Sequence, residues 1–152
     1  MNPKEIIHIK VTKQFKVPVE KVFDAWLDTD FLSKWMFGPD VRDEEIIKLE
    51  NNPEKGGYFS YAVRRDGQEL DHMGTYCEIQ RPNRLVFTWG VDEEAGDESV
   101  VTIEIEPTGN GCRLTLVHKM DPKWADYADR TREGWGYMMD KLNTILEDTT
   151  KQ

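Results

Sequence analysis

The feature that most constrains the fold is a run of six short alternating segments between Val41 and Met120, followed by one long helical segment. The six segments read VRDEEIIKLE, YFSYAVR, HMGTYCEIQ, LVFTWGV, SVVTIEIEP and CRLTLVHK. Alternation of apolar and polar residues is typical of strands with one buried face. The intervening stretches are rich in turn-forming residues, and strands joined by short turns usually pair antiparallel. The pattern therefore predicts an antiparallel meander.

The segments that flank the meander complete the predicted order of elements. IIHIKVTKQF alternates in the same way and predicts a first strand, VPVEKVFDAWLDT predicts a short amphipathic helix, and FLSKWMFGP belongs to a second short helix. Asp28, Thr29 and Asp30 are candidate N-caps for that second helix. DPKWADYADRTREGWGYMMDKLNTILEDT has the apolar spacing of one long helix. The chain should therefore have an α+β fold.

Two glycines interrupt the predicted long helix. Gly134 and Gly136 each cost about 1 kcal/mol in a helix interior relative to alanine. We expect a close approach of the helix backbone to the sheet beside Trp135 to compensate for this cost.

Length and charge restrict the function classes. The 152 residues predict a single domain over 1–152, which is long enough to bury a substantial core. The formal charge of -9 argues against a nucleic acid or an anionic membrane surface as partner. We expect a cytoplasmic protein, because the chain contains no apolar run as long as a signal peptide or a membrane-spanning helix.

No pattern in the sequence indicates a metal or a cofactor. Cys77 and Cys112 lie far apart without a CxxC motif, and we expect both to be buried free thiols. His8 and His72 lack partners at ligand spacing, and DEEAGDE fits a solvated hairpin turn better than a calcium loop. The sequence contains neither a GxGxxG motif nor a P-loop.

Five stretches, taken in their order along the chain, carry a resemblance to a known family. They are VPVEKVFDAWLDTDFLSKWMFGP, EKGGYFSY, GTYCEIQRPNRLVFTW, GNGCRLTL and GWGYMMDKLNTIL. With these stretches the chain resembles the helix-grip fold of the START-like (SRPBCC) superfamily and, within it, the bacterial homologues of the activator of the ninety-kilodalton heat-shock chaperone's ATPase. This resemblance implies a curved antiparallel sheet of about six or seven strands, wrapped around a long C-terminal helix, with two short helices after the first strand.

The resemblance implies several functions, because proteins of this fold bind lipids, hormones or polyketides and a few are enzymes. The leading expectation is non-enzymatic binding of a small hydrophobic molecule, either a lipid or an aromatic or polycyclic metabolite, in a cavity between sheet and helix. One alternative is a chaperone-assisting or stress-related protein-binding module, with a chaperone as partner. Another is a cyclase or dehydratase-like enzyme that acts on an apolar substrate. The oligomeric state is left open.

Alternation along the strands and the helical stripe suggest which side chains face the expected cavity. The candidate ligand-binding residues are Trp35, Phe37, Phe59, Tyr61, Phe87, Trp89, Ile103, Leu116, His118, Trp135, Met138 and Met139. On the strand from Met73 to Ile79 either face could point inward. One face carries Met73, Thr75, Cys77 and Ile79, and the other carries Gly74, Tyr76 and Glu78.

Two features of the expected cavity stay open at this level. Trp35, Met36 and Phe37 would serve equally as an apolar rim at the mouth of the cavity or as a cap on a filled core. His118 could be a structural histidine, a ligand contact or a general acid or base, and Glu78 is the other residue considered for catalysis. No serine or cysteine has the context of a nucleophile.

Overall fold

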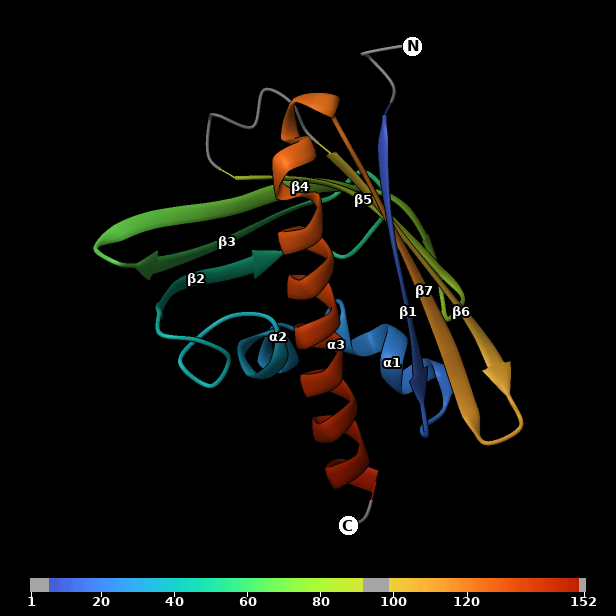
Figure 1. The fold of residues 1–152 in the computed structure, drawn as a ribbon. Coiled ribbons are helices and arrows are strands. Elements are labelled where there is room, and N and C mark those ends of the chain that lie inside the picture. Colours follow the sequence, from blue (N-terminus) through green and yellow to red (C-terminus); the bar gives the residue numbers. More distant parts are fainter. Residues whose placement is uncertain (1–5, 92–98, 151–152) are drawn as a thin grey trace.

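The computed structural model describes residues 6–91 and 99–150, in which a curved antiparallel sheet wraps around one long helix (Figure 1). The strands are β1 (Ile7–Phe15), β2 (Glu45–Asn51), β3 (Tyr58–Arg65), β4 (Gln68–Gln80), β5 (Arg84–Val91), β6 (Ser99–Thr108) and β7 (Gly111–Met120). The helices are α1 (Val19–Ala25), α2 (Thr29–Trp35), the 3-10 segment η2 (Pro122–Tyr127) and α3 (Ala128–Thr150). These elements confirm the predicted α+β helix-grip fold.

Strands β2 to β7 form an antiparallel meander, and β1 is added at one edge of it. The spatial order of the sheet is β1-β7-β6-β5-β4-β3-β2, so β2 to β7 pair with their sequence neighbours and β1 joins at the β7 edge. The register of that last pair runs from Ile7 opposite Met120 to Phe15 opposite Cys112. The strand predicted from Val41 begins only at Glu45, because the residues before it form turns. The predicted DEEAGDE turn lies outside the described residues.

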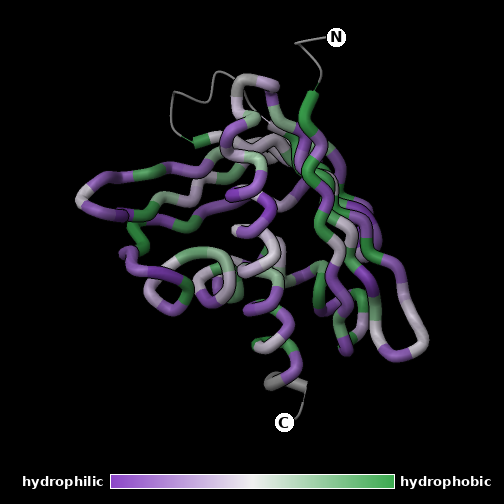
Figure 2. Tube along the Cα trace, in the orientation of Figure 1, coloured by the Kyte–Doolittle hydropathy of each residue, from purple (hydrophilic) through white to green (hydrophobic). Residues whose placement is uncertain are grey.

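Apolar alternation places one face of the sheet against α3, and the tube in Figure 2 shows apolar and polar residues alternating along the strands. The faces predicted to point inward on β3, β5, β6 and β7 are confirmed. Their buried members are Phe59, Tyr61, Val63, Leu85, Phe87, Val101, Ile103, Ile105, Leu114, Leu116 and His118.

Strand β4 uses both of its faces in turn. The inward side chains of its first half belong to the even-numbered face, which includes Gly74 and Tyr76. A register shift between Tyr76 and Glu78 then reverses the facing, so that Ile79 packs against the core and Glu78 pairs with Arg84 on the outside. A bulge of this kind inserts one residue into a strand. Neither of the two faces considered from sequence therefore points inward along the whole strand.

The two cysteines differ in exposure. Cys112 is buried, as predicted, whereas the prediction is wrong for Cys77, which is exposed on the outer face of β4. Gly74 lies opposite Phe59, and a β-carbon on Gly74 would come within 1.9 Å of the Thr88 carbonyl oxygen and 2.6 Å of the Phe59 ring. Glycine is thus what allows the backbone of β5 and this ring to pack against β4 at this point.

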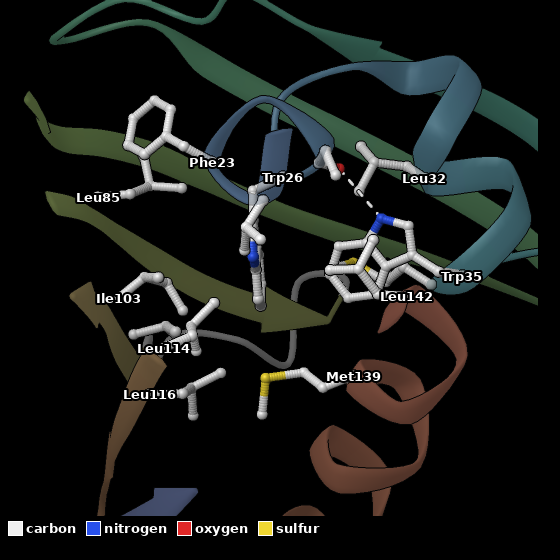
Figure 3. Packing of buried hydrophobic residues seen from close by; sticks show 14 of the residues in the cluster. Phe23, Trp26, Leu32, Trp35, Leu85, Ile103, Leu114, Leu116, Met139 and Leu142 are labelled. Atoms are coloured by element: carbon white, nitrogen blue, oxygen red, sulfur yellow. Dashed lines mark hydrogen bonds between the residues drawn. The ribbon is translucent and has the colours of Figure 1, made fainter. Parts of the chain in front are cut away.

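The two short helices close one end of the core. Asp28 caps α2 by accepting a hydrogen bond from the backbone N–H of Asp30 at 2.9 Å, which confirms one of the predicted caps. Trp35, Met36 and Phe37 are all at most 2% exposed. The indole of Trp35 donates a hydrogen bond to the Ala25 carbonyl at 3.0 Å (Figure 3). This segment is a cap on the core and not the rim of an opening.

The long helix differs from its prediction in two respects. Its first residues form the separate segment η2, which contains Pro122 and a kink at Trp124, so α3 begins at Ala128. The expected close approach at the glycines is wrong, because a β-carbon at Gly134 or Gly136 would meet nothing within 4 Å. Among the described residues, no helix has both the length and the apolar character to span a bilayer.

Candidate functional site

A cavity of about 440 Å³ lies between the sheet and the first half of α3, at the end of the molecule where that helix begins. Its described lining is aromatic, aliphatic or uncharged polar and contains no Asp, Glu, Lys or Arg. The lining residues are Leu70, His72, Trp89, Gly90, Val91, Ser99, His118, Met120, Trp124, Tyr127, Thr131, Gly134, Trp135 and Met138. Such a lining suits a small, predominantly apolar molecule.

Below the cavity the interior is filled by side chains. Figure 3 shows residues of the two short helices, the sheet and α3 in contact across this space. A void there, which Phe59, Tyr61, Phe87 and Trp89 help to line, measures only about 10 Å³ and is far too small for a metabolite. Sheet and helix therefore enclose a packed core toward α1 and α2 and an open space toward η2.

The candidate residues predicted from sequence divide between these two regions. Trp89, His118, Trp135 and Met138 line the cavity. The other candidates pack in the core below it and are not among the lining residues; they are Trp35, Phe37, Phe59, Tyr61, Phe87, Ile103, Leu116 and Met139.

The ring of His118 is held by hydrogen bonds on both nitrogens. The indole N–H of Trp135 donates to Nδ1 at 3.0 Å, so Nδ1 carries a lone pair and the proton of the neutral ring resides on Nε2. Nε2 lies 2.6 Å from the Ser99 hydroxyl oxygen, and that hydroxyl lies 2.8 Å from the carbonyl of Trp89. Because a carbonyl can only accept, Ser99 donates to Trp89 and accepts from His118. Burial lowers the pKa of His118 to about 4, in agreement with a neutral ring.

This arrangement does not activate Ser99 as a nucleophile. A base for serine must offer a lone pair to the hydroxyl proton, and its other nitrogen usually donates to a carboxylate. Here Nε2 of His118 carries the proton, and Nδ1 accepts from an indole. The second residue considered for catalysis, Glu78, lies outside the cavity lining and pairs with Arg84 at 2.6 Å. The geometry favours a rigid wall over an acid–base centre.

His72 contributes a further polar side chain to the lining of the cavity. It is 8% exposed and packs against the rings of Phe37 and Trp89, with centroid distances of 4.8 and 5.5 Å. Its Nδ1 lies 3.0 Å from the carbonyl of Tyr61 and must donate to it, so Nε2 of the neutral ring carries a lone pair. Burial is the largest of the effects that lower the pKa of His72, which keeps the ring neutral.

A buried carboxylate fixes the segment that carries Phe37. The side chain of Glu44 has no exposed surface and accepts hydrogen bonds from the Gly38 N–H at 2.8 Å, from Arg42 at 3.0 Å and from Arg65 at 2.7 Å. Burial acts to raise the pKa of Glu44, but these hydrogen bonds and the two cationic charges hold it below its ordinary value. Arg42 also donates to the Met36 carbonyl.

Several lining residues escaped the analysis of the sequence. His72 belongs to the even-numbered face of β4, and the alternation His72, Gly74, Tyr76 is the signal that could have identified it. Ser99 stands at the very start of its strand, where alternation gives little guidance. Trp124 and Tyr127 were assigned to a continuous helix, but in η2 their rings pack against each other at 5.6 Å beside the cavity.

Within residues 6–91 and 99–150, no group of three or more His, Cys, Asp or Glu side chains is placed to hold a metal ion. The described lining also contains no Lys or Arg side chain that could pair with a phosphate group. The chemistry of the described site is thus that of an apolar enclosure with a few fixed polar atoms.

Comparisons with known proteins agree with the architecture. The family described as "Activator of Hsp90 ATPase homolog 1-like protein" matches residues 16–147. No curated protein matches the sequence.

Three solved structures illustrate the likeness in fold. A protein of unknown function from Staphylococcus aureus, SA2116, superposes with a TM-score of 0.84 at 20% identity and covers 98% of each chain. Protein CV1439 from Chromobacterium violaceum superposes with a TM-score of 0.79 at 24% identity, with 92% of this chain and 97% of that chain covered. An AHSA1-like protein from Aeromonas hydrophila superposes with a TM-score of 0.78 at 18% identity, with 96% of each chain covered. At these identities the likeness shows the fold alone.

Proposed function

Because this chain belongs to the family of Activator of Hsp90 ATPase homolog 1-like proteins, we propose that it is a non-enzymatic binding module for a small, predominantly apolar molecule. The ligand would occupy the cavity between the sheet and the first half of α3. The observation that carries the proposal is the cavity itself, about 440 Å³ of space with an aromatic and uncharged described lining, next to a packed region whose void measures only about 10 Å³.

The glycines of α3 support the proposal. Gly134 lines the cavity and Gly136 does not, and a β-carbon at either position would meet no neighbouring atom within 4 Å. Packing against the sheet therefore does not require glycine at Gly134, although glycine weakens the helix by about 1 kcal/mol relative to alanine. A side chain at this position would extend into the space that a ligand needs.

Variants at these two glycines allow dye binding in the cavity to be tested. N-phenyl-1-naphthylamine is a neutral apolar dye that fluoresces more strongly in apolar surroundings. Titration of the natural chain with this dye should give a saturable increase in fluorescence. Gly134→Leu should abolish or strongly weaken the increase in fluorescence, because the leucine side chain would occupy part of the space that the dye needs.

Gly136→Leu is the matched control, since it makes the same change on the same helix away from the cavity lining. It should bind the dye like the natural chain. Both substitutions should leave the fold intact, because leucine favours a helix more than glycine does. Absence of saturable binding by the natural chain, or equal binding by the Gly134→Leu variant, would contradict the proposal.

Family membership supports a ligand-binding or chaperone-associated module in general. A protein that assists a chaperone through its surface should retain that activity in the Gly134→Leu variant, because the substitution alters only the cavity. Stimulation of a chaperone ATPase by both the natural chain and this variant, without dye binding, would favour the chaperone-associated role.

A further inference from the structure

Several polar groups of the cavity wall bond to one another. Both ring nitrogens of His118 have partners, the hydroxyl of Ser99 bonds to His118 and to the Trp89 carbonyl, and the indole N–H of Trp135 bonds to His118. These groups stiffen the wall and have no remaining hydrogen to donate to a ligand.

Nε2 of His72 is different. Nδ1 is committed to the Tyr61 carbonyl, and no described residue donates a hydrogen bond to Nε2. The atom is not among the fully enclosed polar atoms that lack a partner, so it retains access to the space that His72 lines. An unpaired acceptor on a residue that is only 8% exposed carries a desolvation cost unless a donor reaches it from the cavity.

The ring is also firmly oriented. Phe37 and Trp89 pack against its sides, and the Tyr61 carbonyl fixes both its rotation and its tautomer. The acceptor is therefore presented to the cavity before any ligand binds, which reduces the entropy lost on binding.

We propose that the ligand is uncharged at the end that it buries in the cavity, and that it carries there a hydroxyl or N–H group that donates a hydrogen bond to Nε2 of His72. This inference rests on the proposed binding function and specifies the chemical class of the ligand. A buried carboxylate would find no cationic side chain among the described lining residues, and its oxygens would face the lone pair of His72.

The test compares three ligands of nearly equal shape by isothermal titration at neutral pH. 2-Naphthol offers a hydroxyl donor, 2-methoxynaphthalene replaces the donor by an ether, and 2-naphthoate is an anion. We expect 2-naphthol to bind the natural chain about fivefold to tenfold more tightly than 2-methoxynaphthalene, which is the typical effect of one hydrogen bond. 2-Naphthoate should bind most weakly.

Two substitutions at His72 assign the preference to one atom. In His72→Asn the amide can still donate to the Tyr61 carbonyl, but nothing remains at the position of Nε2, so the preference for 2-naphthol should disappear. In His72→Gln the side-chain oxygen can reach that position, so part of the preference should return. Because the comparison of ligands on the natural chain stands by itself, it decides the donor requirement even if a variant does not fold.

The outcomes separate this inference from the proposed function. Equal binding of 2-naphthol and 2-methoxynaphthalene, strongest binding of 2-naphthoate, or an unchanged preference in His72→Asn would overturn the inference while leaving the cavity as a binding site. Failure of all three ligands to bind, or binding that Gly134→Leu does not weaken, would overturn the proposed function itself.

Discussion

At the scale of single residues, His118 shows how burial sets a protonation state. The ring lies between Trp135 and Ser99 with both nitrogens bonded, and burial lowers its pKa to about 4. Between about pH 6.5 and pH 4 the unfolded chain binds a proton at this histidine that the folded chain does not bind. Unfolding is therefore favoured as the pH falls through this range.

Replacement of His118 should reveal its share in this loss of stability. On acidification from pH 6.5 to pH 4, His118 should reduce the free energy of unfolding by on the order of 3 kcal/mol. His118→Gln should flatten this part of the curve of stability against pH, as measured by urea denaturation. His8→Gln, at an exposed position on β1, is the control for a histidine-to-glutamine change. An equally steep curve for His118→Gln would show that other groups cause the loss.

At the scale of elements, the connection between α2 and β2 depends on one buried charge. Glu44 joins Arg42 and Arg65 to the backbone of Gly38 and so holds the turn that carries Phe37 against the core. The neighbouring residue, Glu45, also pairs with an arginine, but that contact is exposed. Two adjacent glutamates thus make similar ion pairs in different surroundings.

Because the surroundings differ, the two glutamates should contribute differently to the free energy of unfolding. Glu44→Gln should lower the free energy of unfolding by about 2–3 kcal/mol, because it removes the charge that compensates two partly buried arginines. Glu45→Gln should change it by less than about 0.5 kcal/mol, since exposed ion pairs contribute little. Urea denaturation of both variants measures the difference. Similar effects of the two substitutions would contradict the buried role of Glu44.

The pH dependence of that difference has a definite sign. The pKa of Glu44 is held below its ordinary value of 4.5, so its contribution is present above that pH and is lost as the pH falls through the lower, folded value. The advantage of the natural chain over Glu44→Gln should therefore shrink only below about pH 4.5. This window lies below most of the one assigned to His118.

At the scale of the whole molecule, sheet and helices share one cluster of buried residues, with the cavity at one end of it. A ligand that binds only the folded state should therefore stabilise the chain as a unit. We expect N-phenyl-1-naphthylamine to raise the melting temperature and to saturate at one molecule per chain.

The size of this effect follows from mass action. A free ligand concentration of 100 times Kd should add about 2.7 kcal/mol to the free energy of unfolding. Differential scanning fluorimetry and a titration at a protein concentration well above Kd give the shift and the stoichiometry. The Gly134→Leu variant should show neither. The shift itself keeps growing with free ligand concentration. A stoichiometry above one molecule per chain in the titration would indicate binding at the surface.

Much of the architecture could be predicted because it depends on local patterns. Alternation along β3, β5, β6 and β7 gave the buried faces, and the apolar stripe gave the long C-terminal helix. Where a pattern was interrupted, prediction stopped: the register shift after Tyr76 reverses the facing of β4, and η2 separates Trp124 from α3. The second interruption places Trp124 and Tyr127 in the cavity wall, whereas the first turns Ile79 toward the packed core.

Outside β4, the sequence by itself determined which side chains of the strands and of α3 turn toward the space between sheet and helix, because facing follows from the period of each element. Only the tertiary structure decided how that space is filled. Residues with the same inward facing became packed core at Phe59 and cavity wall at Trp89 and His118. The reason is that an empty volume depends on the summed sizes of side chains from several elements and on where α3 begins, and no local pattern records either quantity.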